Sequence, residues 1–412
     1  MIIIEVDRMS AYTATNTTTQ NDSIYLDNAA STPLLNEVFL EMMPYLRTHY
    51  GNPSSLHKHG FDTRRAISVA RRRVASIIGA SDKEIVFTSG GTESNNLAIK
   101  GALECRSKAS RRTHLITSKI EHESVLEPIR ELEKEGFEVT YLPVSNDGIV
   151  NPDEVKENIS GTKTAFVSIM LVNNEVGTIQ PVKEIAKIIQ STSKEILLHC
   201  DATQGVGKIP VNVQTLGIDL LTISSHKING PKGTGALYVR RGVRISPLLL
   251  GGGQEALLRS GTENVYGIVG FGKACEIALS KITSNEREIS IIRNYLVKKV
   301  LNDIPSARYN GSVIHRIPNN AHFTISGING EDLVMKLDEY GIAASTGSAC
   351  SSRKQKSSHV LKAMGFSYDE VTGSLRISLG FQNTIQEVDR FVTILSQVIE
   401  ELRKFSPITP RL

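Results

Sequence analysis

The chain has 412 residues, of which 40% are hydrophobic and 22% are charged, and its formal net charge is +4. These values are typical of a globular protein with more than one domain, and they exclude a disordered chain. The small charge gives no sign of nucleic-acid binding, and no apolar run reaches the ~18 residues of a membrane span. We therefore expect a cytoplasmic protein that binds neither membranes nor, directly, nucleic acid.

Residues 10–23 are polar and lack periodicity, and we predict a flexible N-terminal tail over residues 1–23. From Ile24 onward, strand-like apolar runs alternate with helical runs such as ESNNLAIKGALECRS and ESVLEPIRELEKEG. The strand-like runs are EIVFTS, THLITSK, EVTYLPV, TAFVSIM, EILLHCD, DLLTISS and GALYVR. This alternation predicts an α/β fold, in which a mainly parallel seven-stranded sheet is covered by helices on both faces.

The order of predicted helices and strands changes after about residue 282. A charged helix is expected near 284–303, followed by the runs NAHFTISG, EDLVMKLDEYG and LRISLG and a last helix near 385–404. This order is typical of a smaller α+β domain. We predict a large ligand-binding domain over 38–282 and a small domain formed by 24–37 and 283–412.

The four cysteines, at positions 105, 200, 275 and 350, have no C-x-x-C spacing. This excludes a disulfide framework or a zinc finger and indicates a reducing compartment. Cys200 and Cys275 lie in apolar runs and are expected to be buried. Cys350 lies in AASTGSACSSRKQKSSH, where the basic residues that follow it would favour the reactive thiolate. We predict an exposed, functional cysteine loop.

Ligands of parallel α/β sheets bind beyond the carboxyl ends of the strands, so the residues after each predicted strand are candidates. Gly90, Gly91, Thr92 and Glu93 precede a helix, which is typical of an anion-binding turn but also of an ordinary cap. Later strands are followed by His122, by Asn173–Glu175, by Asp201 and Gln204, and by Ser224, His226 and Lys227. Each group alone has a purely structural explanation.

Together, however, these side chains meet the needs of one cofactor. Pyridoxal phosphate bonds to a lysine, needs an acid beside its ring nitrogen and donors around its phosphate, and often stacks against a ring. Lys227 ends a strand-like run between polar residues and glycines, where a solvated lysine is not expected. We predict that Lys227 is the nucleophile.

Motifs along most of the chain resemble those of a single enzyme family. They include YLDNAASTP, GNPSSLHKHG, IVFTSGGTESNNLAIKG, TSKIEHESVL, VSIMLVNNEVGTIQP, HCDATQGVGK, SSHKINGPKGTGALYVR, LRSGTENV, ASTGSACSS and LRISLG. From Ile24 to about Phe405 the chain resembles the NifS/IscS-type cysteine desulfurases, fold-type I pyridoxal-phosphate enzymes of the class V aminotransferase family.

The resemblance implies a role for each matching residue. Lys227 would bond to the cofactor, Asp201 would hold the ring nitrogen, Gln204 would lie near the ring O3′, and His122 would stack on the ring and act as an acid or base. The phosphate ligands would be Gly91, Thr92, Ser224, His226 and, from the other subunit of a homodimer, Thr262. Asn174 and Arg376 would hold the substrate, and Cys350 would accept its sulfur. No metal is implied.

The implied reaction turns L-cysteine into L-alanine and leaves a persulfide on Cys350. An acceptor, such as an iron–sulfur scaffold protein or a tRNA-thiolation relay, would then take the sulfur. An aminotransferase or a selenocysteine lyase on the same fold remains an alternative, although an aminotransferase has no use for Cys350. A binding protein that has lost its chemistry would require a degraded catalytic position, and Lys227, Asp201, His122 and Cys350 are all intact.

Overall fold

The computed structural model describes residues 23–105, 112–347 and 357–405, and it confirms the predicted α/β fold. The central sheet has seven strands in the order β2-β8-β7-β6-β5-β3-β4, and only β8 runs antiparallel to its neighbours. The strands are β2 (Ile85–Thr88), β3 (His114–Ser118), β4 (Glu138–Leu142), β5 (Thr164–Ser168), β6 (Leu197–Asp201), β7 (Leu220–Ser224) and β8 (Gly235–Val239).

Both faces of the central sheet are buried, which explains why its strands are apolar at successive positions. In β3, Leu115 packs into one hydrophobic cluster and Ile116 into another, because neighbouring side chains of a strand point to opposite faces. The helices along this part of the chain are α2 (Asn36–Arg47), α3 (Lys58–Ile77), α4 (Gly91–Asn96), α6 (Glu123–Lys134), α7 (Pro152–Asn158), α8 (Val182–Thr192) and α9 (Val213–Leu216).

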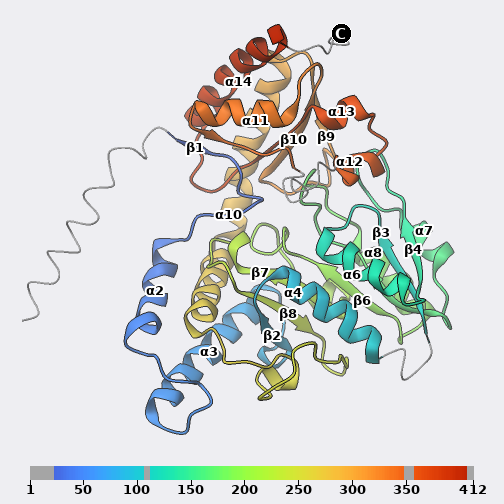
Figure 1. The fold of residues 1–412 in the computed structure, drawn as a ribbon, viewed down its shortest axis with the longest axis vertical. Coiled ribbons are helices and arrows are strands. Elements are labelled where there is room, and N and C mark those ends of the chain that lie inside the picture. The colour runs from blue at the N-terminus through green and yellow to red at the C-terminus, as the bar shows by residue number, and fades with distance from the viewer. Residues whose placement is uncertain (1–22, 106–111, 348–356, 406–412) are drawn as a thin grey trace, which may run out of the picture.

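A second hydrophobic cluster lies around the antiparallel sheet β12-β10-β9, drawn in the upper part of Figure 1. The strands are β9 (Ala307–Asn310), β10 (Asn320–Ile325) and β12 (Ser374–Ser378). The remaining helices are α11 (Gly330–Glu339), α12 (His359–Ala363), α13 (Tyr368–Thr372) and α14 (Ile385–Phe405), so the predicted last helix is confirmed.

One long helix, α10 (Val265–Asp303), links the two regions. Phe271 packs into the core of the large sheet, and Leu296 packs into the second cluster. The helix expected near 284–303 is therefore only the second half of a longer one. The middle of α10 is polar and exposed, so the apolar periodicity is interrupted there. The expected domain boundary near 282 falls inside α10, and the division into domains stays a prediction.

The N-terminal segment crosses from the second region to the first. β1 (Ile24–Tyr25), labelled in Figure 1, pairs in parallel with β11 (Ile342–Ala343). A few residues later, the N–H and hydroxyl groups of Thr32 both donate to the carbonyl of His226, just beyond β7. This path brings the carbonyls of Ala29 and Ala30 to the end of the central sheet. In the part of the chain that the structure describes, no helix is long and apolar enough to cross a bilayer.

Candidate active site

A cavity of about 260 Å³ lies where β5, β6 and β7 end. Its walls bring together residues from both sheets and from the N-terminal crossing. The predicted site residues that line it are Gly91, Thr92, His122, Asn174, Asp201, Gln204, Ser224, His226, Lys227 and Arg376. The carboxyl edge of the sheet is therefore where the predicted residues converge.

Lys227 stands in a single 3₁₀ turn, Ser225–Lys227, directly after β7. Its ammonium group donates to the carbonyl of Ala29 at 2.6 Å and to that of Ala30 at 2.8 Å. The turn ends the strand abruptly, and the N-terminal crossing provides acceptors in front of it. Two backbone carbonyls thus hold the Lys227 ammonium group at the cavity wall. Carbonyl oxygens are not nucleophiles, so Lys227 is the nucleophile of this cluster.

Asp201 is the last residue of β6, and only 6% of it is exposed. Its carboxylate accepts hydrogen bonds from the Asn95 amide at 2.7 Å and from the Thr203 N–H at 2.9 Å. These two donors offset part of the cost of burying the charge. Our sequence analysis missed Asn95, although it follows Gly91 by one helical turn and so had to share its face.

His122 is the N-cap of α6, and its ring is oriented by Ser124. The Ser124 N–H donates to Nδ1 at 3.1 Å, and the Ser124 hydroxyl lies 2.7 Å from the same nitrogen. Since a backbone N–H can only donate, Nδ1 is an acceptor and the proton of the neutral ring is on Nε2. Ser124 also accepts from Asn95, so one network joins His122 to Asp201.

The opposite end of the cavity is suited to an anion. A Cβ added to Gly91 would lie 3.2 Å from the Thr203 Oγ1 and 3.6 Å from the Ser224 Cβ, so a side chain there would fill the space. The pKa of His226 is lowered to about 4 by burial and by the charges of Lys227 and Lys232. His226 is therefore neutral at pH 7 and contacts a ligand as a donor or acceptor without charge.

Arg376 enters the cavity from β12 and is 3% exposed. It donates to the Asp27 carboxylate at 2.8 Å and to the Asn174 carbonyl at 3.0 Å, while its Nε has no partner among the described residues. Asn174 does not directly follow a strand as expected, because β5 already ends at Ser168 and a turn intervenes. The sequence analysis also missed Asp27, which neutralises the buried arginine.

Among the described residues, one predicted site residue does not line this cavity. Thr262 is exposed and lies outside the lining of its own chain's cavity. Cys350 and the basic residues Arg353, Lys354 and Lys356 are outside the described residues, as is the predicted N-terminal tail up to residue 22. The cysteines expected to be buried, Cys200 and Cys275, are completely buried.

Comparisons with known proteins identify the family. The model of the class-V aminotransferase family matches residues 24–391. A cysteine desulfurase IscS of Methanosarcina thermophila is 47% identical over 96% of each chain, and one of Dictyoglomus turgidum is 47% identical over 93% of this chain and 96% of its own. A solved NifS-like protein superposes with a TM-score of 0.87 at 39% identity and covers 92% of this chain and 100% of its own. The chain belongs to the class-V aminotransferases, among the cysteine desulfurases.

The predicted resemblance is thereby confirmed, and the cofactor of this enzyme family is pyridoxal 5′-phosphate. The cavity fits that group on its own evidence. The Asn95 Oδ1 and the Thr203 Oγ1 are buried at the cavity without partners among the described residues, so polar atoms await a ligand. Asp201 suits a protonated ring nitrogen, and the small residue at Gly91 leaves room for a phosphate.

One buried acid beside the active site makes the enzyme's stability depend on pH. Burial raises the pKa of Glu121 to about 8, despite hydrogen bonds from the Ser118 hydroxyl and the Met170 N–H. The folded state thus favours the protonated acid, and this contribution to stability is full below pH ~4.5 and is lost as the pH rises through 8.

Glu121→Gln should remove this loss, because glutamine keeps the shape and the acceptor oxygen without the charge. We expect the variant to gain about 1–3 kcal/mol relative to the wild type between pH 5 and pH 9. Thermal unfolding of both proteins at the two pH values measures it. Glu131→Gln, on the exposed side of α6, is the matched control and should show no such difference. Equal pH profiles for Glu121→Gln and the wild type would contradict the prediction.

Proposed function

We propose that this enzyme is a cysteine desulfurase that converts L-cysteine to L-alanine and passes the sulfur through a persulfide on Cys350 to an acceptor protein. The observation that carries the proposal is the cavity that unites Lys227, Asp201, His122 and Arg376. The similarity to proteins named cysteine desulfurase supports the choice of reaction over transamination.

Lys227 is the residue proposed to bond to the cofactor. When bound, pyridoxal phosphate supplies an aldehyde that captures an amine and a ring that takes up electrons from the neighbouring carbon. The Lys227 amine would hold the cofactor before the substrate binds and, once free, would serve as the base for the α-proton. Asp201 keeps the ring nitrogen protonated, and His122 offers an Nε2 proton at the cavity wall.

Arg376 and Asn174 are proposed to hold the substrate. The unpartnered Nε of Arg376 is a donor that a carboxylate can accept from, and the ion pair with Asp27 fixes the guanidinium plane. The backbone carbonyl of Asn174 accepts from the same guanidinium, and both residues line the cavity.

Cys350 is proposed as the sulfur acceptor. It is only three positions after Gly347, which lines the cavity, and three residues of chain span at most ~11 Å. Its thiolate attacks the substrate sulfur, so an S–S bond forms and the substrate's Cβ–S bond breaks. The electron pair of that bond stays on carbon, which takes a proton and becomes the methyl group of alanine.

We further propose that the enzyme works as a homodimer. Large apolar side chains are exposed along α2 and α3 and in the segment before α10: Phe39, Leu40, Leu46, Leu56, Phe61, Leu250 and Leu257. Monomers rarely expose so many together. The Arg71 guanidinium binds both oxygens of Glu255 at 2.6 Å and so fixes the segment that leads to Thr262. This exposed threonine is proposed to reach the phosphate of the partner subunit.

We also propose a cellular compartment for the enzyme. Cys105, Cys200 and Cys275 are free thiols, as in a reducing compartment such as the cytoplasm. An iron–sulfur scaffold protein is the proposed sulfur acceptor, with a tRNA-thiolation relay as the alternative.

A peptide-mapped mass spectrum after exposure to L-cysteine without reductant tests the reaction. We expect one added sulfur on the Cys350 peptide together with an equal amount of alanine. Peptides with Cys105, Cys200 and Cys275 are internal controls and should stay unmodified. Alanine without modification of Cys350 would refute the sulfur carrier, and absence of alanine would return the assignment to an aminotransferase. L-selenocysteine in parallel separates a lyase specific for selenium.

A further inference from the structure

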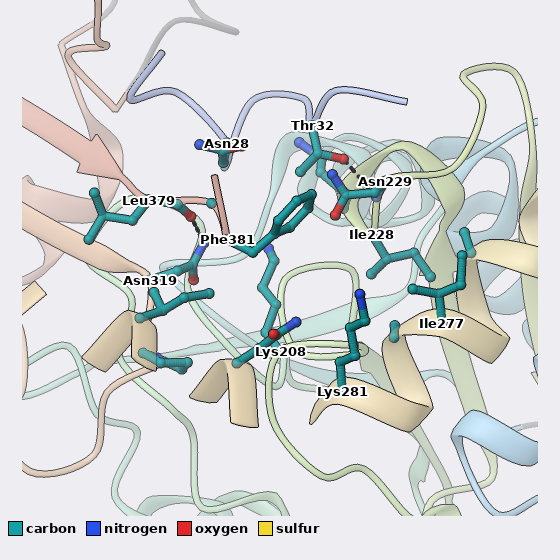
Figure 2. Close-up of a pocket in the computed structure, with 18 of the residues that line it drawn as sticks. Asn28, Thr32, Lys208, Ile228, Asn229, Ile277, Lys281, Asn319, Leu379 and Phe381 are labelled. Carbon is teal, nitrogen blue, oxygen red and sulfur yellow. Dashed lines mark hydrogen bonds between the residues drawn. The ribbon is translucent and has the colours of Figure 1, made fainter. Parts of the chain in front are cut away.

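A second cavity, of about 110 Å³, lies on the other side of Lys227. It is lined by the middle of α10, the N-terminal crossing and the residues after β12. Figure 2 shows Lys208 and Lys281 among its lining residues, with Ile228 and Ile277 on one side and Asn319 and Leu379 on the other. Lys227 lines both cavities, whereas Gln204 lines only the first and Lys208 only the second.

Lys208 and Gln204 meet between the two cavities. The Lys208 ammonium donates to the Gln204 Oε1 at 2.7 Å, and the Gln204 Nε2 donates to the Ala29 carbonyl at 2.9 Å. The Lys208 Nζ carries N–H donors whether or not it is protonated, and a backbone carbonyl can only accept. Together they allow a single orientation of the amide, in which Oε1 faces Lys208 and Nε2 faces the crossing and the active-site cavity.

The same carbonyl binds the residue that captures the cofactor. The Ala29 oxygen accepts from the Gln204 Nε2 and also from the Lys227 Nζ at 2.6 Å. A chain of hydrogen bonds therefore runs from Lys208 through Gln204 and Ala29 to Lys227. Because Nε2 has a second N–H, the amide still has a donor for an oxygen atom of a ligand in the cavity.

Burying the charged form of Lys208 at this place costs free energy. Among the described residues no carboxylate pairs with it, and burial, with Lys227 and Arg376 nearby, lowers its pKa to about 7. His226 also faces it, and Lys281 and Glu286 line the same cavity from α10. A lysine with no role would be replaced here by an apolar residue of similar length without loss.

We propose that Lys208 is a positioning residue for the cofactor, which acts by fixing the Gln204 amide with an N–H toward the ring oxygen of bound pyridoxal phosphate. The inference rests on the proposed placement of Gln204 near that oxygen. A donor at the ring oxygen stabilises its ionised form and makes it a weaker base. The oxygen then attracts less strongly the proton that it shares with the nitrogen joining Lys227 to the cofactor.

The test is a pH titration of the visible absorption band of the holoenzyme, which reports that proton. Lys208→Met keeps the length of the side chain but removes the donor and the charge. We expect the midpoint of the titration to rise by roughly one pH unit, because both losses favour the protonated nitrogen. Lys281→Met makes the same chemical change in the same cavity without contacting Gln204, and its midpoint should stay at the wild-type value.

A double variant shows whether the effect passes through Gln204. In a Gln204→Leu background, Lys208→Met should shift the midpoint by less than half as much as it does alone, since the amide is already absent. An unchanged midpoint in Lys208→Met with bound cofactor would overturn the proposal, and so would full additivity with Gln204→Leu.

If the Lys208→Met variant does not bind the cofactor, the titration midpoints of Lys208→Arg and Lys208→Gln test the proposal instead. Arginine is also a pure donor and should keep the midpoint near the wild-type value, whereas a glutamine can present either end and should raise it. Equal midpoints of these two variants would overturn the proposal. The titration needs no turnover, so a wild-type enzyme that forms no alanine would refute the proposed function and leave this inference standing.

Discussion

Lys227→Ala is expected to lower the rate of alanine formation at least about 10³-fold, because in the proposed function one side chain both bonds to the cofactor and removes the α-proton. The variant should still fold. The Ala29 carbonyl keeps its hydrogen bond from Gln204, so the loss of Lys227 does not leave that oxygen without a partner. Alanine assays and the absorption of the bound cofactor measure the change.

The covalent bond has its own readout. Borohydride reduction followed by peptide mapping should place the cofactor on the Lys227 peptide of the wild type and nowhere in the variant. Lys281→Ala is the control, since it removes an exposed lysine from the neighbouring cavity. A Lys227→Ala enzyme with more than a tenth of wild-type activity would show that another amine serves as the nucleophile.

Asp201→Asn is expected to lower turnover by roughly 10²–10⁴-fold, since an amide cannot keep the ring nitrogen of the cofactor protonated. Asp201 accepts one hydrogen bond on each carboxylate oxygen, whereas asparagine has only one oxygen. In one orientation its NH2 group would face the NH2 group of Asn95, and in the other it would face the Thr203 N–H. A loss of about 1–3 kcal/mol in the free energy of unfolding should accompany it. Steady-state kinetics and denaturant unfolding measure the two effects separately.

Asn95→Ala separates the charge from its hydrogen bond. It removes the 2.7 Å contact to Asp201 but leaves the carboxylate and the Thr203 N–H in place. We expect a stability loss similar to that of Asp201→Asn with a much smaller loss of turnover. If both variants lost turnover equally, the carboxylate would act by its position in the network, and the role proposed for its charge would be wrong.

Described residues on either side of positions 348–356 make contacts at the edge of the active site. The Gly347 carbonyl accepts from Arg376 at 3.4 Å, and the Ser358 hydroxyl donates to the buried Glu175 at 2.6 Å. Burial raises the pKa of Glu175, an effect that the Ser358 hydroxyl and the charge of Arg376 oppose. Gly347 and Ser358 thus both contact residues beside Asn174.

The sequence alone predicted the fold class, which the structure confirms, and it predicted that most of the candidate site residues would meet at one edge of the sheet. Apolar runs buried on both faces predict a parallel sheet, and the residues after such strands must converge at its carboxyl edge. Asp201, Ser224, His226 and Lys227 could be placed this way, because each lies at or just beyond the end of a strand. The separate motifs then pointed to one family.

Tertiary structure decided the contacts between residues distant in sequence. Asp27 pairs with Arg376, Ala29 joins Gln204 to Lys227, and neither link has a periodic or local signal. The full length of α10 could not be predicted from the sequence either. Its polar middle runs between two hydrophobic cores, where no apolar stripe is needed. Sequence patterns record which face of an element is buried, whereas the orientation of an amide or the partner of a buried charge depends on which chains meet in space.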